Sequence, residues 1–214
     1  MDYISLIFQA IIVVYSITIH EFSHAWSANY FGDPTPRLQG RLTINPLSHV
    51  DPLWLILLFT AGFGRGRPVQ FNPQYLQNPV RQEFWIAMAW PISNIIIAFL
   101  SLILVNCIKI WMISPMADMM IQFWSLSALI NIGMAVFNML PLPPLDGFRI
   151  IKLITGKTYL WIEDYAPYIV LVIFALSALP GYDLIGVVIK PIIQTVLLIL
   201  VWLTNLPFII LWLW

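Results

Sequence analysis

Long apolar runs separated by short polar segments dominate the chain. About twenty apolar residues in a helix are needed to cross the hydrocarbon core of a bilayer. The pattern therefore predicts an all-α integral membrane protein, a polytopic bundle of about five to six spanning helices. The predicted helices cover about residues 3–30, 83–112, 118–140 and 167–179, and the last one runs from about residue 191 to the C-terminus.

Two shorter patterns lie between the first two predicted helices. The apolar segment 53–63 is too short to cross the bilayer, so we interpret it as a re-entrant or interfacial element. Apolar and polar residues alternate in segments 41–44 and 68–71, next to glycines and prolines, which is typical of β-strands. The sequence thus predicts a small re-entrant β-ribbon element beside the helices.

The basic residues give the predicted bundle an orientation. With the N-terminus outside and segment 53–63 entering and leaving on one side, only Lys109 and Lys190 face out. The other basic residues lie on the cytoplasmic side, as the positive-inside rule requires. They are Arg37, Arg41, Arg65, Arg67, Arg81, Arg149, Lys152 and Lys157.

The composition agrees with a membrane protein. Hydrophobic residues make up 60% of the chain and charged residues 9%, whereas a soluble domain has about a quarter charged residues. The formal net charge is +0, so no basic surface indicates a nucleic-acid partner. The single cysteine, Cys107, cannot form an internal disulfide, and the redox compartment stays open.

Ionisable residues occur near the end of the first predicted helix, in the sequence His20-Glu21-Phe22-Ser23-His24. Residues four apart lie on the same helix face, so His20 and His24 can bind one zinc ion. Glu21 lies beside them, where it can take a proton from water. Ionisable groups at membrane depth are costly unless they are paired, face a cavity or bind a metal. The alternative interpretation is a polar cluster at a helix end.

Zinc held by two histidines needs a third protein ligand, and a catalytic site leaves the fourth position to water. His49 and the carboxylates are the candidates. Asp146 is favoured because it follows a proline-broken segment, residues 138–145, at the predicted depth of the histidines. Unwound backbone at that depth is tolerated only where it lines a cavity or is buried in protein. The alternative is that Asp146 caps a short helix over residues 148–155.

These residues resemble the motifs of the site-2 protease family, zinc metalloproteases that work within membranes. Residues 20–24 match its first motif, and residues 138–147 are similar to its second motif, Asn-x-x-Pro-x-Pro-x-Leu-Asp-Gly. Residues 40–52 are similar to a loop of the compact prokaryotic branch, which lacks regulatory domains. The resemblance covers about residues 12–155.

The resemblance implies one Zn²⁺ per chain, with His20, His24 and Asp146 as its ligands. It implies Glu21 as the general base, and Asn138 as a residue that binds the substrate backbone or stabilises the oxyanion. The substrate would be a transmembrane or membrane-associated protein in the lipid bilayer, and the edge of the ribbon would pair with it or only seal the site. The location would be a prokaryotic plasma membrane, with the active site towards the cytoplasm.

Residues 1–214 would then form one transmembrane metalloprotease domain, with the zinc site in about residues 1–155 and added helices in about residues 166–214. The chain departs from the family pattern at one place. Where the family commonly has Ala-Gly-Pro, this chain has Ala89-Trp90-Pro91, so the resemblance does not define the helix packing or the shape of the substrate entrance there. A transporter or channel with a polar ion path is the alternative function. A zinc-binding scaffold without activity is another. The oligomeric state and the substrate are open.

Overall fold

The computed structural model describes residues 3–51, 67–143, 145–156 and 184–212, together with Tyr165, Tyr168 and Val172. Four helices in this part of the chain are long and apolar enough to cross a membrane. The chain is therefore a multi-pass, helical integral membrane protein. Its described elements are α1 (Tyr3–Tyr30), α2 (Thr35–Leu38), η1 (Pro46–Ser48), η2 (Pro73–Tyr75), α4 (Pro79–Trp111), α5 (Pro115–Asn138), α6 (Asp146–Thr155) and α8 (Leu184–Trp212).

Helix α1 covers the predicted residues, whereas α4, α5 and α8 begin a few residues before the apolar runs that predict them. Prolines 79 and 115 stand in the first turns of α4 and α5, where a missing N–H costs nothing. The side chain of Asn78 caps α4 by accepting a hydrogen bond from the N–H of Arg81. These first turns contain proline and polar or charged residues such as Arg81 and Asp118, which weaken a hydrophobic run, so the prediction from hydropathy starts too late. The predicted segment 53–63 lies outside the described residues, and so does helix 167–179, apart from Tyr168 and Val172.

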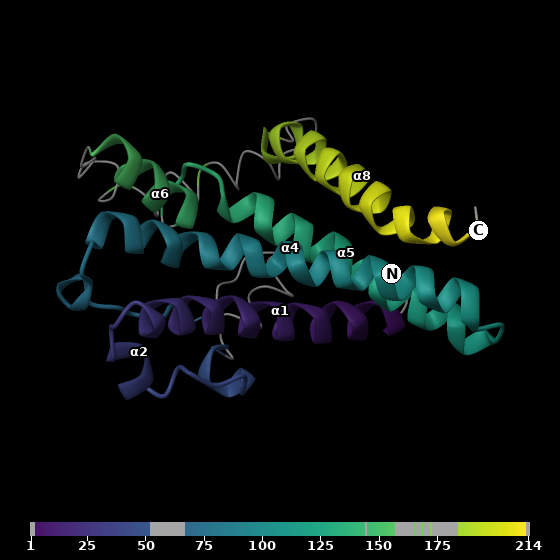
Figure 1. The fold of residues 1–214 in the computed structure, drawn as a ribbon, viewed down its shortest axis with the longest axis horizontal. Helices are drawn as coiled ribbons and strands as arrows, with labels where there is room; N and C mark the ends of the chain where they lie inside the picture. Colours follow the sequence, from purple (N-terminus) through teal and green to yellow (C-terminus); the bar gives the residue numbers. More distant parts are fainter. Residues whose placement is uncertain are drawn as a thin grey trace.

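The three helices α1, α4 and α5 lie side by side, with alternating directions along the chain (Figure 1). Helix α4 is central, because it packs against α1, α5, α6 and α8. Small residues such as Ala98 and Ala128 allow the backbones of α4 and α5 to approach closely. The buried core between α4, α5 and α8 consists of Ala98, Leu102, Ala128, Ile132, Val136, Ile189 and Leu200.

The predicted β-ribbon is not formed by strands: the residues that the structure describes include helices, turns and loops, but no β-strand. Loop 41–51 and segment 67–72 are connected by isolated hydrogen bonds to backbone carbonyl groups and not by a ladder of strand pairing. The N–H of Arg67 donates to the carbonyl of His49 at 2.7 Å. The guanidinium of Arg41 donates to the carbonyl of Ser48 and, at 3.4 Å, to that of Arg67.

Asp33 anchors segment 67–72 against the end of α1. The chain reverses after α1 at Gly32, whose φ of 102° suits glycine. The Asp33 carboxylate is fully buried and accepts hydrogen bonds from the N–H groups of Thr35 at 2.9 Å and Asn72 at 2.6 Å. The segment before α4 is thereby held close to the polar end of α1.

We expect Asp33→Ala to lower the free energy of unfolding by about 2–3 kcal/mol, because a buried carboxylate and its bonds to two backbone N–H groups are lost. The measurement is the unfolding midpoint of the purified protein in detergent. Asp118→Ala, at an exposed position in the first turn of α5, is the matched control. Equal midpoints for the two variants would show that Asp33 has no anchoring role.

Candidate active site

The polar end of α1 carries three predicted site residues on adjoining faces of one helix. His20 and His24 lie one turn apart, with their ring centroids separated by 5.0 Å. His24 and Glu21 are buried, with 8% and 5% of their surface exposed. Because the helix repeats every 3.6 residues, the sequence alone brings the two imidazoles to one face.

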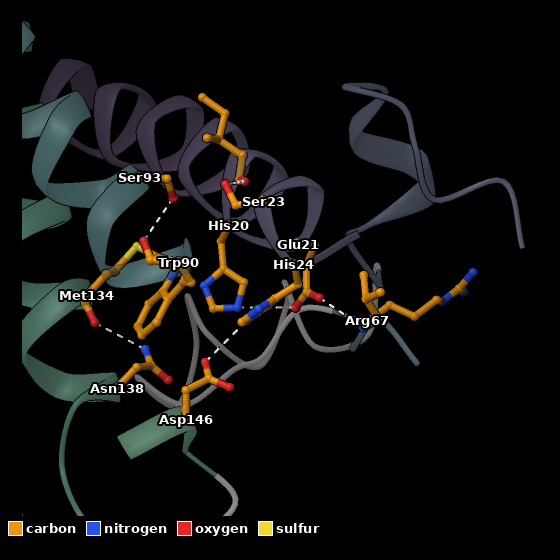
Figure 2. Close-up of polar contacts among 12 residues, drawn as sticks. His20, Glu21, Ser23, His24, Arg67, Trp90, Ser93, Met134, Asn138 and Asp146 are labelled. Carbon is orange, nitrogen blue, oxygen red and sulfur yellow. Dashed lines mark hydrogen bonds and ion pairs between the residues drawn. The ribbon is translucent and has the colours of Figure 1, made fainter. Parts of the chain in front are cut away.

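His24 is held by a backbone group of the neighbouring helix. Its Nδ1 forms a hydrogen bond of 2.8 Å with the carbonyl of Ile86 on α4. Pro91 lacks the N–H that would bond to the carbonyl of Ala87, and such a proline disturbs the helix at that turn. The carbonyl of Ile86 lies next to this break. With Nδ1 occupied, Nε2 of His24 faces Asp146, whose Oδ2 is 3.3 Å away (Figure 2).

Asp146 reaches the histidines because α6 crosses closely over the end of α5. It is the first residue of α6, after a turn in which the N–H of Leu145 bonds to the carbonyl of Leu142 at 2.8 Å. A Cβ atom on Gly147 would lie 2.2 Å from the carbonyl oxygen of Met139, which no side chain can tolerate. Only glycine therefore allows this crossing, and the crossing determines where the Asp146 carboxylate lies.

The three side chains that the resemblance assigns to zinc come together. One ligand atom from each of His20, His24 and Asp146 lies within 4.8 Å of the other two. Two ligands on a tetrahedral zinc ion, each about 2.1 Å from the metal, are about 3.4 Å apart. The 3.3 Å between Nε2 of His24 and Oδ2 of Asp146 fits this geometry. Two imidazole nitrogens and a carboxylate are also a typical zinc donor set.

Glu21 lies beside this donor set. Its Oε1 is 3.6 Å from Nε2 of His20, and its Oε2 accepts a hydrogen bond of 3.0 Å from the N–H of Val69. Segment 67–72 thus passes directly next to the carboxylate. A backbone N–H carries no signature in the sequence, so this contact could not be predicted from the residue types.

Two other predicted residues are placed differently. Asn138 is the last residue of α5, and its Nδ2 donates to the carbonyl of Met134 at 3.2 Å, on the Asp146 side of His20 (Figure 2). His49 is buried in its loop, where Nε2 forms a hydrogen bond of 2.7 Å with the carbonyl of Thr43. Burial lowers the pKa of His49 below its ordinary value, which favours the neutral ring. His49 is not part of the His20, His24 and Asp146 donor set.

Trp90, the departure from the family pattern, lies in the wall of the site. The indole is fully buried, and its ring centroid is 4.2 Å from that of His20. The large residue therefore does not separate α1 from α4 but fills the space between them beside a predicted ligand (Figure 2). The sequence marks Trp90 as unusual, but its contact with His20 depends on how the two helices pack.

Comparisons with known proteins point to the same chemistry. A family model described as peptidase family M50 matches residues 105–179. YwhC of Bacillus subtilis, named as a zinc metalloprotease, is 40% identical over 148 residues, which are 68% of this chain and 68% of YwhC. Rip2 of Mycolicibacterium smegmatis, also named as a zinc metalloprotease, is 35% identical over 142 residues, which are 62% of this chain and 51% of Rip2. No solved structure matches the chain.

The fold and the donor set define a membrane-embedded zinc metalloprotease. With the YwhC match, the chain belongs to peptidase family M50, the site-2 protease family. The residues present fit the zinc that this family implies, and a protease is favoured over the transporter or channel that buried ionisable residues also suggest.

We expect Gly147→Ala to push α6 away from the end of α5 and to displace the Asp146 carboxylate. A displacement of about 1 Å can cost about 100-fold in activity, so cleavage should fall by about that factor and bound zinc should be lost. Gly133→Ala is the control, because its added Cβ would only contact Ile193 at 3.8 Å. Full zinc content and activity in Gly147→Ala would contradict the role of this crossing.

Proposed function

We propose that the protein hydrolyses peptide bonds of transmembrane or membrane-associated substrates at the site formed by α1 and α6. The observation that carries the proposal is the 3.3 Å approach of His24 and Asp146, beside a buried glutamate. A transporter needs polar side chains along a path, but it does not need a zinc donor set with a carboxylate base next to it. An inactive zinc-binding scaffold would not need the buried Glu21.

In this proposal His20, His24 and Asp146 hold one zinc ion per chain. When bound, zinc acidifies a water molecule and stabilises negative charge on the scissile carbonyl oxygen. Glu21 accepts the proton of the attacking water, and later gives it to the leaving amine. The N–H of Val69 holds one oxygen of the Glu21 carboxylate at 3.0 Å, so the other oxygen is the one oriented towards the reacting groups.

Asn138 receives the role of binding the substrate backbone or stabilising the oxyanion. Its amide lies next to the site, at the end of α5, where a turn about its side-chain torsions would exchange the Met134 carbonyl for a substrate oxygen. An amide N–H is a suitable donor to a developing oxyanion.

We further propose that segment 67–72 receives the unwound substrate strand. A helical substrate hides its carbonyls in internal hydrogen bonds, so it must be extended before attack. Segment 67–72 passes beside Glu21 and is anchored at both ends, by His49 and by Asp33. A substrate paired with it would lie next to the base. The predicted ribbon would then be completed by the substrate.

The orientation and domain proposals rest on the distribution of charge and on packing. The end of α1, the start of α4 and α6 lie at one end of the bundle (Figure 1). The described basic residues of α6, of the start of α4 and of the chain between α1 and α4 favour a cytoplasmic site. They are Arg37, Arg41, Arg67, Arg81, Arg149 and Lys152. The bacterial relatives support a prokaryotic plasma membrane. The packing of α8 on α4 and α5 supports one domain over residues 1–214, with the zinc site in about residues 1–155 and added helices in about residues 166–214.

We expect Glu21→Gln to slow cleavage by about 100- to 10,000-fold, because the amide cannot accept the proton of the attacking water. Zinc content should stay at the parental level, since Glu21 is not among the proposed ligands. The assay uses a single-span apolar peptide with a fluorophore and a quencher at its ends, and zinc is measured by mass spectrometry.

Glu83→Gln serves as the control, because it removes another half-buried carboxylate on α4. Asp146→Ala should lose both zinc and cleavage. Cleavage that survives Glu21→Gln would reject the assigned base, and zinc that survives Asp146→Ala would reject the ligand set.

We expect Gln70→Pro to slow cleavage of the same peptide without loss of zinc, because proline removes a backbone N–H from the proposed pairing edge. Gln70 is exposed, so its side chain can be changed without a cost in packing. Gln70→Ala keeps the N–H and should cleave at the parental rate. If Gln70→Pro cleaves at the parental rate, segment 67–72 does not pair with the substrate and only covers the site.

A further inference from the structure

The two histidines of the site differ in how their second ring nitrogen is satisfied. Nδ1 of His24 bonds to the carbonyl of Ile86 at 2.8 Å. Nδ1 of His20 is buried and has no hydrogen-bond partner among the described residues, while its Nε2 faces Glu21. A histidine that binds a metal through Nε2 carries its proton on Nδ1, and that N–H is normally donated to an oxygen. The oxygen that accepts the Nδ1 proton of His20 must therefore lie on the side of the ring that faces away from Glu21.

Three further buried polar groups lie on α1 and α4, at the level of His20 or one helical turn deeper. The indole of Trp90 packs on the His20 ring at 4.2 Å, on the side away from Glu21 (Figure 2). Ser16 lies one turn before His20 on α1, and Asn94 lies one turn after Trp90 on α4. Helices α1 and α4 run antiparallel, so Ser16 and Asn94 lie at about the same depth, one helical turn further from the polar end of α1 than His20 and Trp90.

The side chains of Ser16, Trp90 and Asn94 are fully buried. Within the described part of the chain, Nε1 of Trp90 and both polar atoms of the Asn94 amide have no hydrogen-bond partner. Oγ of Ser16 makes no hydrogen bond of normal geometry either, although the Tyr15 hydroxyl lies near it. Buried polar groups in proteins are normally paired with protein or with ordered water. Nδ1 of His49 and Oδ1 of Asn131 share this deficit, but they lie on other segments of the chain. Helix spacing places His20, Ser16, Trp90 and Asn94 together on two packed helices, where one small polar ligand can serve them.

Four of the five unpartnered atoms in this group are complementary to one water molecule, and Nδ2 of Asn94 is the fifth, which this water does not serve. The N–H groups of His20 and Trp90 can each donate to the water oxygen. The water can in turn donate to Oγ of Ser16 and Oδ1 of Asn94. Buried waters typically make about two to four such bonds. A metal ion would suit the set less well, because two of its four members are N–H donors.

We propose that Ser16, Trp90 and Asn94 form a buried water-binding site that holds the imidazole of His20 in position for zinc. The inference rests on the proposed function, since it takes His20 as a ligand. Ser16, Trp90 and Asn94 are positioning residues that act through His20. The tryptophan in place of the family glycine then supports the ligand in two ways, because its ring packs on the imidazole and its N–H helps to bind the water.

Two conservative substitutions test the proposal in the full-length protein in detergent. Trp90→Phe keeps a buried aromatic ring and removes the N–H, whereas Ser16→Ala removes only a hydroxyl. Loss of outer-shell partners typically costs about 10- to 100-fold in metal affinity, so zinc should pass to a chelating dye correspondingly faster. The effects should not add in the double variant, because both substitutions disturb the same water.

Ser101→Ala and Trp124→Phe are the matched controls. Ser101 is a buried α4 hydroxyl that bonds to the carbonyl of Ile97 at 2.8 Å and to Ser127 at 2.9 Å, so it is not one of the unpartnered groups. Trp124 lies on α5, in ring contact with Phe123. Both controls should release zinc at the parental rate. Parental zinc release by both Ser16→Ala and Trp90→Phe would overturn the proposal.

A second measurement reports on His20 directly. In the zinc-loaded protein with ¹⁵N-labelled histidine, we expect a slowly exchanging Nδ1–H resonance that is missing in His20→Gln. Ser16→Ala should shift it and speed its exchange with solvent, whereas Ser101→Ala should not. A resonance that is the same in Ser16→Ala and in the parent would also overturn the proposal. If zinc release responds as expected but Glu21→Gln still cleaves, the water site stands and the proposed base fails.

Discussion

Ionisable side chains at membrane depth persist only where partners satisfy them, and this constraint governs the architecture around His20, Glu21 and His24. In an apolar surrounding, an unpaired carboxylate or imidazolium is far more costly than in water. The bundle meets this cost with groups from different segments: the Ile86 carbonyl, the Val69 N–H and the Asp146 carboxylate. The polar end of α1 is therefore satisfied only when α4, α6 and segment 67–72 are all in place.

Irregular backbone supplies these partners. A regular helix uses its own N–H and C=O groups internally, and so offers nothing to a neighbouring side chain except at its ends. Pro91 leaves the carbonyl of Ala87 without its helix partner, one residue after the carbonyl that binds His24. Gly147 lets the start of α6 approach the carbonyls of Met139 and Leu140, in the turn directly after α5. Non-helical backbone at membrane depth is tolerated where protein surrounds it.

Trp90 shows how a family site tolerates a large substitution. The glycine common in the family lets helices approach closely, and a tryptophan at that position would be expected to force them apart. Here the indole is fully buried and packs on the His20 imidazole. The volume that would have separated α1 and α4 instead forms part of the wall of the site.

Hydropathy and spacing predicted the membrane class and the courses of α1, α4 and α5, because a spanning helix and a His-x-x-x-His face are local properties. The family followed from the resemblance of residues 20–24 and 138–147 to its motifs. The β-ribbon was predicted from alternation alone, and the described residues contain no strand, because pairing depends on contacts between distant segments. The sequence by itself determined that two imidazoles and a glutamate share one end of a buried helix. The sequence also favoured Asp146 as the carboxylate that meets them. Only the tertiary structure decided how close Asp146 comes and which backbone groups join it, because those contacts join segments far apart in the chain and depend on how closely the helices pack.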